Sequence, residues 1–135
     1  MSEQIRVLLV EDNPDNYEIF RTILEHFGYA VHHAWTAEEG LEMVSAVLPR
    51  VILMDIGLPG MDGVSATRIL KSDPATAGIP VLAITAHALT EDRQRALEAG
   101  FDAYLTKPIE PREVVAEVMR WTGSAKPEGG EGGGA

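Results

Sequence analysis

Five short apolar runs recur along the chain and predict the strands of a sheet. Three of them are continuous: IRVLLV at 5–10, VILM at 51–54 and IPVLAI at 79–84. Continuous runs of this length are typical of parallel strands that are buried on both faces. Two weaker runs, YAVHHA at 29–34 and DAYL at 102–105, predict the remaining strands.

The segments between these runs carry apolar residues at helical spacing. Pro14 suits the first turn of a helix, and Gly28 ends the same pattern. Thr36 and Glu39 have the spacing of a capping box at the start of the next helix. The five expected helices cover residues 14–27, 37–48, 64–70, 90–99 and 111–121.

Strand and helix patterns alternate five times, which predicts an α/β fold with one parallel sheet. Right-handed crossovers then place helices on both faces of that sheet. The length of 135 residues suits a single domain, which we expect over residues 1–122. From residue 123 to 135 the sequence holds no apolar side chain larger than alanine, so we expect a flexible Gly-rich tail or a truncated linker there.

The composition argues against several classes of function. The chain has no cysteine, so disulfides, thiol catalysis and Cys-ligated metals are excluded. The net charge of −10 argues against binding to nucleic acid, which usually requires a basic surface. No apolar run approaches the roughly 20 residues that cross a bilayer, and no signal-peptide pattern is present at the start. We therefore expect a cytoplasmic protein without a membrane partner.

Polar residues follow four of the five predicted strands at the point where each strand ends. Glu11 and Asp12 follow the first strand, Asp55 the third, Thr85 the fourth and Lys107 the fifth. The carboxyl ends of parallel strands meet at one edge of the sheet, where ligands bind in such folds. We therefore expect these side chains to converge.

The residue types in this group suit one kind of chemistry. Three neighbouring carboxylates repel one another, and a divalent cation together with a lysine relieves that repulsion. Ligands that are all oxygen favour a hard ion such as Mg²⁺, or Mn²⁺ in its place. An aspartate oxygen can attack phosphorus to give an acyl phosphate. The metal, Lys107 and Thr85 would then stabilise the charge of the transferring group.

Four sequence blocks, LLVEDNPDN, ILMDIGLPGMDG, LAITAHA and AYLTKPI, closely resemble the receiver domains of two-component response regulators. The similarity covers about residues 4–121. It implies a flavodoxin-like (β/α)5 fold with strand order 2-1-3-4-5. It also implies a phosphoacceptor that catalyses only its own phosphorylation and dephosphorylation, and is otherwise not an enzyme.

The resemblance assigns a role to each residue of the group. Asp55 would accept a phosphoryl group from the phosphohistidine of a sensor histidine kinase or a histidine phosphotransfer protein. Asp12, Asp55 and the backbone carbonyl of Gly57 would bind Mg²⁺ directly, and Glu11 would act through a metal-bound water. The residues expected to contact the phosphoryl oxygens are Thr85 and Lys107.

The resemblance also implies a conformational switch. Tyr104 would turn inward when Thr85 engages the phosphoryl group, which would reshape the surface of the fourth helix, fifth strand and fifth helix. A downstream protein, or a second copy in a homodimer, would bind that surface. The Lys107–Pro108 bond would be cis, and Gly57 and His87 would set the lifetime of the phosphate.

Plain structural roles are the alternative for several of these residues. Thr85 could be an ordinary strand-end threonine, and Tyr104 could be a packed aromatic. Trp35 and Trp121 are interpreted as packing residues outside the pocket motifs. The adjacent residues His32 and His33 lie on a predicted strand and point to opposite faces, so they are interpreted as surface and packing residues rather than a metal pair.

Three other functions compete with a phosphoacceptor. A phosphatase of the haloacid-dehalogenase type needs a second acid two residues after its nucleophile, where this chain has Gly57. A degenerate receiver that only binds partners would not need the complete set of acids, threonine and lysine. A flavin or nucleotide binder of the same fold would need a Gly-rich loop after the first strand, which the sequence lacks.

Overall fold

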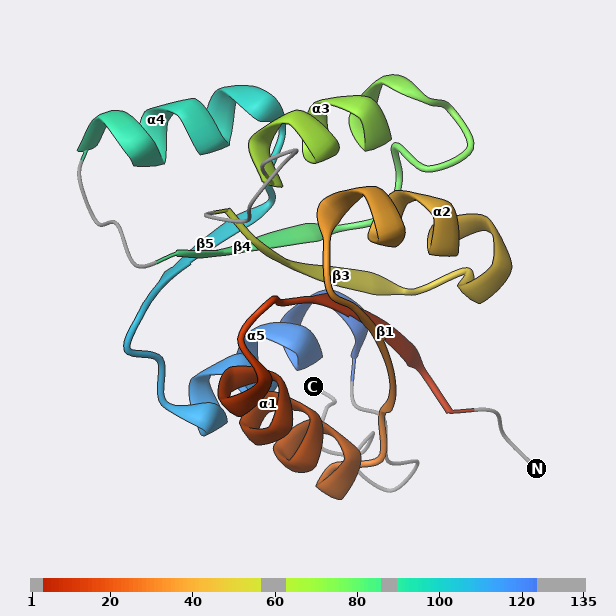
Figure 1. The fold of residues 1–135 in the computed structure, drawn as a ribbon, viewed down its shortest axis with the longest axis vertical. Helices are drawn as coiled ribbons and strands as arrows, with labels where there is room; N and C mark the ends of the chain where they lie inside the picture. Colours follow the sequence, from red (N-terminus) through yellow and green to blue (C-terminus); the bar gives the residue numbers. More distant parts are fainter. Residues whose placement is uncertain (1–3, 57–62, 86–89, 124–135) are drawn as a thin grey trace.

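A parallel sheet of five strands lies between two layers of helices (Figure 1). The computed structural model describes residues 4–56, 63–85 and 90–123. The strands are β1 (Arg6–Val10), β2 (Ala30–Ala34), β3 (Val51–Asp55), β4 (Val81–Thr85) and β5 (Ala103–Thr106). The helices are α1 (Pro14–His26), α2 (Ala37–Val47), α3 (Gly63–Ser72), α4 (Thr90–Ala99) and α5 (Pro111–Thr122). The sheet order β2-β1-β3-β4-β5 confirms the predicted topology.

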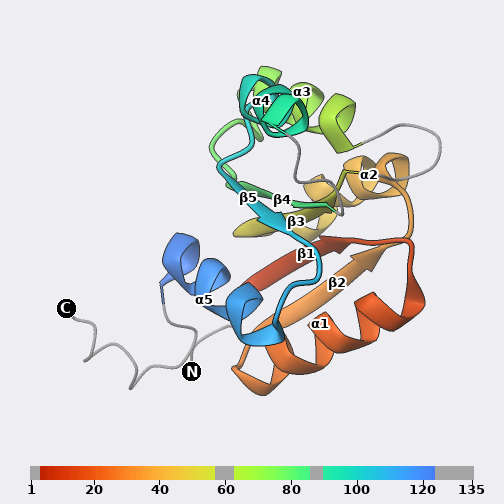
Figure 2. The same ribbon diagram turned by 90° about the vertical axis from the view of Figure 1, so that its left-hand side faces the viewer.

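The two faces of the sheet carry separate cores. Helices α1 and α5 cover one face, and α2, α3 and α4 cover the other (Figure 2). Strands β3 and β4 are buried along their whole length because they lie in the middle of the sheet with helices on both faces. Alternate side chains of each strand enter opposite cores. This explains why their sequences read as continuous apolar runs.

The predicted ends of the elements differ from the observed ends by one or two residues at most places. Helix α1 begins at Pro14, and the side chain of Asn13 accepts a hydrogen bond from Asn16 N at 3.0 Å. Thr36 caps α2 in the same way, but the carboxylate of Glu39 accepts from the backbone of the preceding tryptophan rather than completing a capping box. Within the described residues no helix has the length and apolar character needed to cross a bilayer.

Several large apolar side chains are more exposed than core residues, including the two tryptophans that were interpreted as packing residues. Trp35 is 45% exposed because it follows β2, which is the edge strand of the sheet. Trp121 is 37% exposed on the last turn of α5, and its indole N–H donates to Glu117. Three apolar residues in the segments with helical spacing are about half exposed or more, namely Ile19, Leu48 and Ile69.

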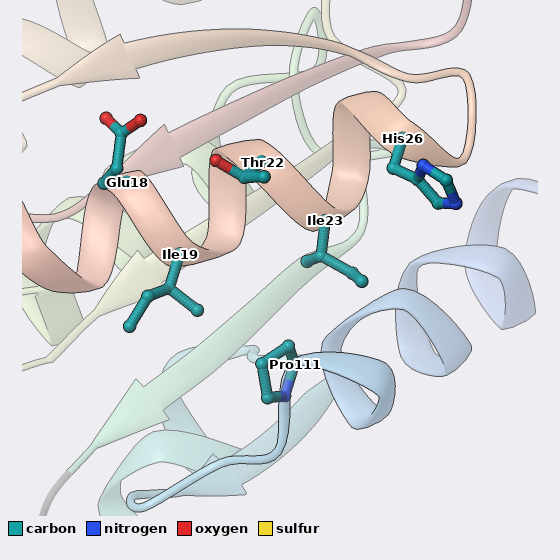
Figure 3. Close-up of a pocket in the computed structure, with 6 residues that line it drawn as sticks. All are labelled: Glu18, Ile19, Thr22, Ile23, His26 and Pro111. Atoms are coloured by element: carbon teal, nitrogen blue, oxygen red, sulfur yellow. The ribbon is translucent and has the colours of Figure 1, made fainter.

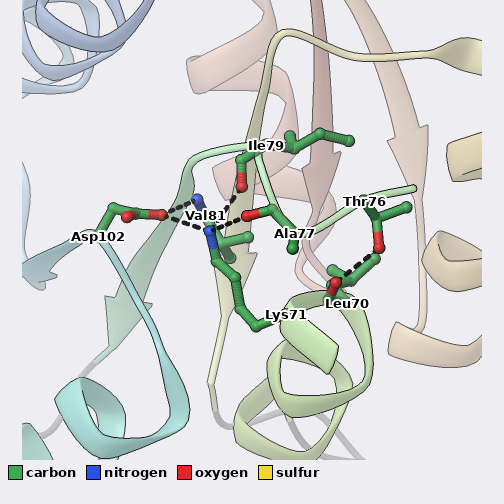
Figure 4. A network of polar contacts seen from close by, with 7 residues as sticks. All are labelled: Leu70, Lys71, Thr76, Ala77, Ile79, Val81 and Asp102. Carbon is green, nitrogen blue, oxygen red and sulfur yellow. Dashed lines mark hydrogen bonds and ion pairs between the residues drawn. The ribbon is translucent and has the colours of Figure 1, made fainter. Parts of the chain in front are cut away.

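A polar network fastens α3 to the amino ends of β4 and β5 (Figure 4). The ammonium of Lys71 donates to the carbonyls of Ala77 and Ile79 at 3.2 and 2.9 Å. It also pairs with Asp102 at 2.9 Å, and the same carboxylate oxygen accepts from Val81 N at 2.8 Å. One lysine thus links the end of α3, the loop after it and the amino ends of two strands.

Replacing this lysine should destabilise the fold. Lys71→Met keeps most of the aliphatic stem but leaves two carbonyls and one carboxylate without their shared donor. We expect the free energy of unfolding to fall by about 1–3 kcal/mol, measured by urea denaturation. The matched control is Arg120→Met, because the side chain of Arg120 is 73% exposed in its pair with Glu117. That control should change stability by less than about 0.5 kcal/mol, and equal losses in both variants would contradict the role of the network.

Candidate functional site

Three carboxylates meet at the carboxyl edge of neighbouring strands. Glu11 and Asp12 directly follow β1, and Asp55 is the last residue of the adjacent strand β3. One carboxylate oxygen from each of the three lies within 4.8 Å of the others. Two of these acids, Glu11 and Asp55, are buried, and Asp12 is exposed. The structure therefore brings together the acids that the strand-end argument placed at one edge.

Glu11 is the most unusual of these acids because it is fully buried. One carboxylate oxygen, Oε2, accepts from Asn13 N at 3.1 Å. The other, Oε1, has no hydrogen-bond partner within the part of the chain that the structure describes. Burial, and then the charge of Asp55, raise the pKa of Glu11 to about 7, although Lys107 acts in the opposite direction. A buried, incompletely satisfied carboxylate of this kind can accept a cation.

Lys107 provides the positive charge of the site. Its Nζ lies 2.9 Å from Asp55 Oδ2 and 3.7 Å from Glu11 Oε1. Its backbone N–H donates to Thr85 O at 2.7 Å, which fixes the start of the loop after β5 beside β4. Desolvation works against the charged ammonium, but the hydrogen bond to Asp55 and the nearby negative charges outweigh it and raise the pKa of Lys107. The peptide bond to Pro108 is cis, which confirms that expectation.

Thr85 and Tyr104 lie on neighbouring strands and on the same face of the sheet. Thr85 ends β4 and is 1% exposed. Tyr104 pairs in register with Ala83, two residues before Thr85, so alternation places Thr85 and Tyr104 on one side. Tyr104 is partly buried against the core on the side of α2, α3 and α4. The proposed switch residues are thus diagonal neighbours.

The sequence reasoning gave no role to Gly63, which the structure places against the backbone of Asp55. The Gly63 N–H donates to Ile56 O at 3.2 Å. A Cβ at residue 63 would lie only 2.6 Å from the carbonyl oxygen of Asp55. A larger residue would therefore push the start of α3 away from β3. Gly63 directly precedes the helix predicted from residue 64, where glycine is acceptable as a cap, so the sequence carried no distinct signal of this contact.

Several residues of the sequence interpretation lie outside the described part of the chain. They are Gly57, whose carbonyl was expected to bind metal, His87, and the tail from residue 124 to 135.

The sequence interpretation missed a contact made by one described residue. His33, interpreted as a surface or packing residue, places Nε2 2.8 Å from the carbonyl oxygen of Glu11.

The raised pKa of Glu11 predicts how the stability of the metal-free protein depends on pH. The unfolded chain binds this proton with a pKa near 4.5, and the folded chain with a pKa of about 7. As pH rises through this window, the folded state is left with a buried negative charge and loses stability. Between about pH 5.5 and about pH 8 we expect this carboxyl group to lower the free energy of unfolding by about 2 kcal/mol.

Urea denaturation of the metal-free protein at the two pH values, with a chelator present, measures this loss. Glu11→Gln removes the titrating group and should flatten the dependence by the same amount. An unchanged pH dependence in the Gln variant would show that Glu11 does not titrate in this window.

Residues 7–119 match the response regulator receiver domain family. The chain belongs to this family. Receiver domains serve as phosphoacceptors in two-component signalling and are not classical enzymes. They bind Mg²⁺ at an acidic pocket, and the receiver domain described above carries a cluster of three acids at the corresponding edge of its sheet.

Relatives of this receiver domain include a response regulator and a sensor protein. The polar-differentiation response regulator DivK of Brucella ovis is 36% identical over 119 residues, which cover 88% of this chain and 97% of DivK. The sensor protein GacS of Pseudomonas syringae pv. syringae is 40% identical over 126 residues. Those residues cover 89% of this chain but only 14% of GacS. The receiver domain is therefore similar both to a response regulator and to a small part of a sensor protein.

A solved structure gives the same fold with a metal present. The receiver domain of the sensor histidine kinase PA1611 from Pseudomonas aeruginosa PAO1 is 36% identical, with a TM-score of 0.82. The match covers 90% of this chain and 100% of that domain. In that protein a magnesium ion is coordinated in the active-site cleft.

Proposed function

We propose that Asp55 is the residue of this receiver domain that accepts the phosphoryl group, and that the donor is a phosphohistidine of a kinase or phosphotransfer protein. The observation that carries this assignment is the contact of 2.9 Å between Lys107 Nζ and Asp55 Oδ2 within the acid cluster. A lysine placed on one carboxylate oxygen both compensates the charge of the free acid and remains available to the incoming phosphoryl oxygens.

The transfer is a displacement at phosphorus. An oxygen of the Asp55 carboxylate forms a bond to phosphorus as the bond from phosphorus to the donor imidazole nitrogen breaks, and the electron pair leaves with that nitrogen. Negative charge accumulates on the three phosphoryl oxygens during this step. Lys107 donates hydrogen bonds to this charge, and Thr85 is expected to contribute its hydroxyl. Return of Asp55 to its free form is then hydrolysis of the acyl phosphate by water.

The residues present fit a magnesium ion. The donors are all oxygen, and the unsatisfied Oε1 of buried Glu11 leaves acceptor capacity in the cluster. Asp12 and Asp55 would hold the ion directly, with Gly57 through its carbonyl and Glu11 through a water. The ion would supply positive charge to the phosphoryl oxygens. Its binding would also relieve the repulsion that raises the pKa of Glu11.

We propose that phosphorylation is read through Thr85 and Tyr104 on the surface of α4, β5 and α5. A groove of about 370 Å³ lies beside Tyr104, lined also by Thr106 of β5 and by Glu113 and Glu117 of α5. A change in the position of Tyr104 would alter the wall of this groove directly. The surface is thus suited to a downstream protein or to a second copy of the receiver.

The phosphodonor is proposed to dock between α1 and α5. Figure 3 shows Ile19 and Ile23 of α1 facing Pro111 at the start of α5 across a groove of about 430 Å³. A second groove shares Ile19 and Pro111 and is also lined by Lys107 and Pro108. Because the two grooves share these residues, we treat them as one path along α1 and the start of α5 that reaches Lys107, the residue paired with Asp55. A histidine-bearing helical protein seated on this path could present its phosphohistidine to the site.

This docking surface predicts a variant that is slow to accept phosphate from a protein donor but not from a small molecule. Ile19→Glu places a charge on the path, and we expect phosphotransfer from a protein donor to slow at least about tenfold, as for loss of an interface hot spot. Phosphorylation by a small phosphodonor should not change, because the site itself is intact. Ile69→Glu is the matched control, because Ile69 is equally exposed on α3, at 48% against 49% for Ile19. Equal slowing by both variants would place the donor elsewhere.

The proposed function has a direct test on the wild-type chain. With Mg²⁺ and a small phosphodonor such as acetyl phosphate, the chain should gain a single phosphoryl group by intact-mass spectrometry, and a chelator should prevent the gain. Failure of the wild type to gain the group would point to a receiver that only binds partners. Repeated turnover of phosphomonoesters would instead revive the phosphatase of the haloacid-dehalogenase type.

A further inference from the structure

An aromatic stack lies against the acid cluster on the side of β2. The rings of Tyr17 and His33 are stacked, with centroids 3.7 Å apart and planes inclined by 11°. The Trp35 ring meets the edge of His33 at 4.2 Å and 63°. The guanidinium of Arg21 lies 5.7 Å from the centre of the Tyr17 ring. The imidazole therefore packs against two larger rings, Tyr17 on its face and Trp35 at its edge, which restricts its rotation.

The held imidazole makes one polar contact with the site. His33 Nε2 lies 2.8 Å from the carbonyl oxygen of Glu11. A carbonyl can only accept, so Nε2 carries the proton and donates it. The preceding backbone bond from Glu11 N to Ala34 O, at 3.1 Å, continues the pairing of β1 with β2. Glu11 is thus bonded to β2 twice, just past the end of β1. Its N–H donates to Ala34 O, and its carbonyl accepts from the side chain of His33.

The peptide that accepts this bond joins two members of the acid cluster. Its carbonyl belongs to Glu11 and its nitrogen to Asp12, so its orientation sets the direction in which both side chains leave the backbone. Asp12 is exposed, and burial contributes little to holding it in place. A fixed donor on this peptide is a means of keeping the two carboxylates at the separation that the cluster shows.

We propose that His33 is a positioning residue for the acid cluster, acting through its hydrogen bond to the Glu11 carbonyl and held by the stack of Tyr17 and Trp35. The inference rests on the proposed function, because the acids it positions are those proposed to bind Mg²⁺ and phosphate. It assigns His33 no contact with the metal or with the phosphoryl group. This role requires only that the Nε2–H of His33 donate to the carbonyl oxygen of Glu11.

Two substitutions separate the hydrogen bond from the stack. His33→Phe keeps a ring that packs against Tyr17 and Trp35 but removes the Nε2–H donor. His33→Gln removes the ring but places an amide N–H at a similar reach. His32→Phe is the matched control on the neighbouring residue of β2, whose side chain points to the opposite face of the sheet.

Two measurements test the role in the receiver without phosphorylation. By calorimetric titration with Mg²⁺ alone, His33→Phe should bind about tenfold more weakly than the wild type, as is usual when a group supporting a metal ligand is lost. The Gln variant and the control should stay within about threefold. Amide hydrogen exchange of metal-free protein should show faster exchange at Asn13, whose N–H is bonded to Glu11 Oε2, in the Phe variant only.

The outcomes distinguish the inference from the function on which it rests. A wild type that neither binds Mg²⁺ nor accepts phosphate removes the proposed function itself. A wild type that does both, with a Phe variant of unchanged Mg²⁺ affinity and unchanged Asn13 exchange, overturns the positioning role alone. Equal weakening in the Phe and Gln variants, with equal losses of melting temperature, would also overturn it, because the stack and not the hydrogen bond would then matter.

Discussion

The Asp55→Asn variant will gain no phosphoryl group under conditions in which the wild-type chain gains one. An amide has no ionised oxygen to attack phosphorus, so the acyl phosphate cannot form. The position is otherwise suitable, because the side chain is buried and next to Lys107 in the wild type. Intact-mass spectrometry after incubation with Mg²⁺ and a small phosphodonor measures the result.

The fold of this variant should be preserved or strengthened. Replacing one of three clustered carboxylates by a neutral amide relieves repulsion, including part of the repulsion that raises the pKa of Glu11. Asp15→Asn is the matched control, because Asp15 is an exposed acid in the first turn of nearby α1. The control should be phosphorylated like the wild type. Labelling of Asp55→Asn to the wild-type extent would show that another residue is the acceptor.

Lys107→Met will separate metal binding from phosphoryl transfer. The ammonium lies 2.9 Å from Asp55 and is the cation that the structure places on the proposed nucleophile. Without it the rate of phosphorylation should fall about 100-fold or more, as when one donor to a developing oxyanion is lost. Affinity for Mg²⁺ should not fall and is expected to rise, because the acids lose a competing positive charge.

The same variant will be less stable than the wild type without metal. Glu11 and Asp55 then share a buried space without the positive charge of Lys107, and the pKa of Glu11 should rise further because Lys107 normally lowers it. The control is Lys71→Met, which removes a paired lysine of the network at the opposite edge of the sheet. It should lose stability yet keep the wild-type rate of phosphorylation. A wild-type rate in Lys107→Met would exclude the lysine from the transfer.

The fold was predictable because three of its five strands are unambiguous apolar runs. Runs such as residues 51–54 and 79–84 are apolar throughout, which suits only segments covered on both sides. The order of the strands came from the resemblance to receiver domains, since alternation alone allows several orders. The ends of strands and helices were less accurate because they depend on individual capping bonds.

The composition of the site was predictable from the positions where strands end, but its internal contacts were not. Parallel strands bring Asp55 and Lys107 to one edge whatever the side chains do afterwards. The burial of Glu11 and the contact of His33 with its carbonyl depend on how α1 and β2 pack, which periodicity does not encode. The same limit explains why helical spacing did not reveal that Ile19 is about half exposed beside Pro111.

The network around Lys71 has a mechanical consequence for a signal that starts at Asp55. It ties down Val81 and Asp102, which stand at the amino ends of β4 and β5. Thr85 is the last residue of β4, at its carboxyl end, whereas Tyr104 is the second residue of β5 and lies close to the anchored end. The proposed shift of Thr85 toward the phosphoryl group would therefore take place in strands whose amino ends are held by this network. Lys71 would confine that shift to the carboxyl end of β4, beside Asp55, and keep the register of β4 with β5 unchanged at the other end.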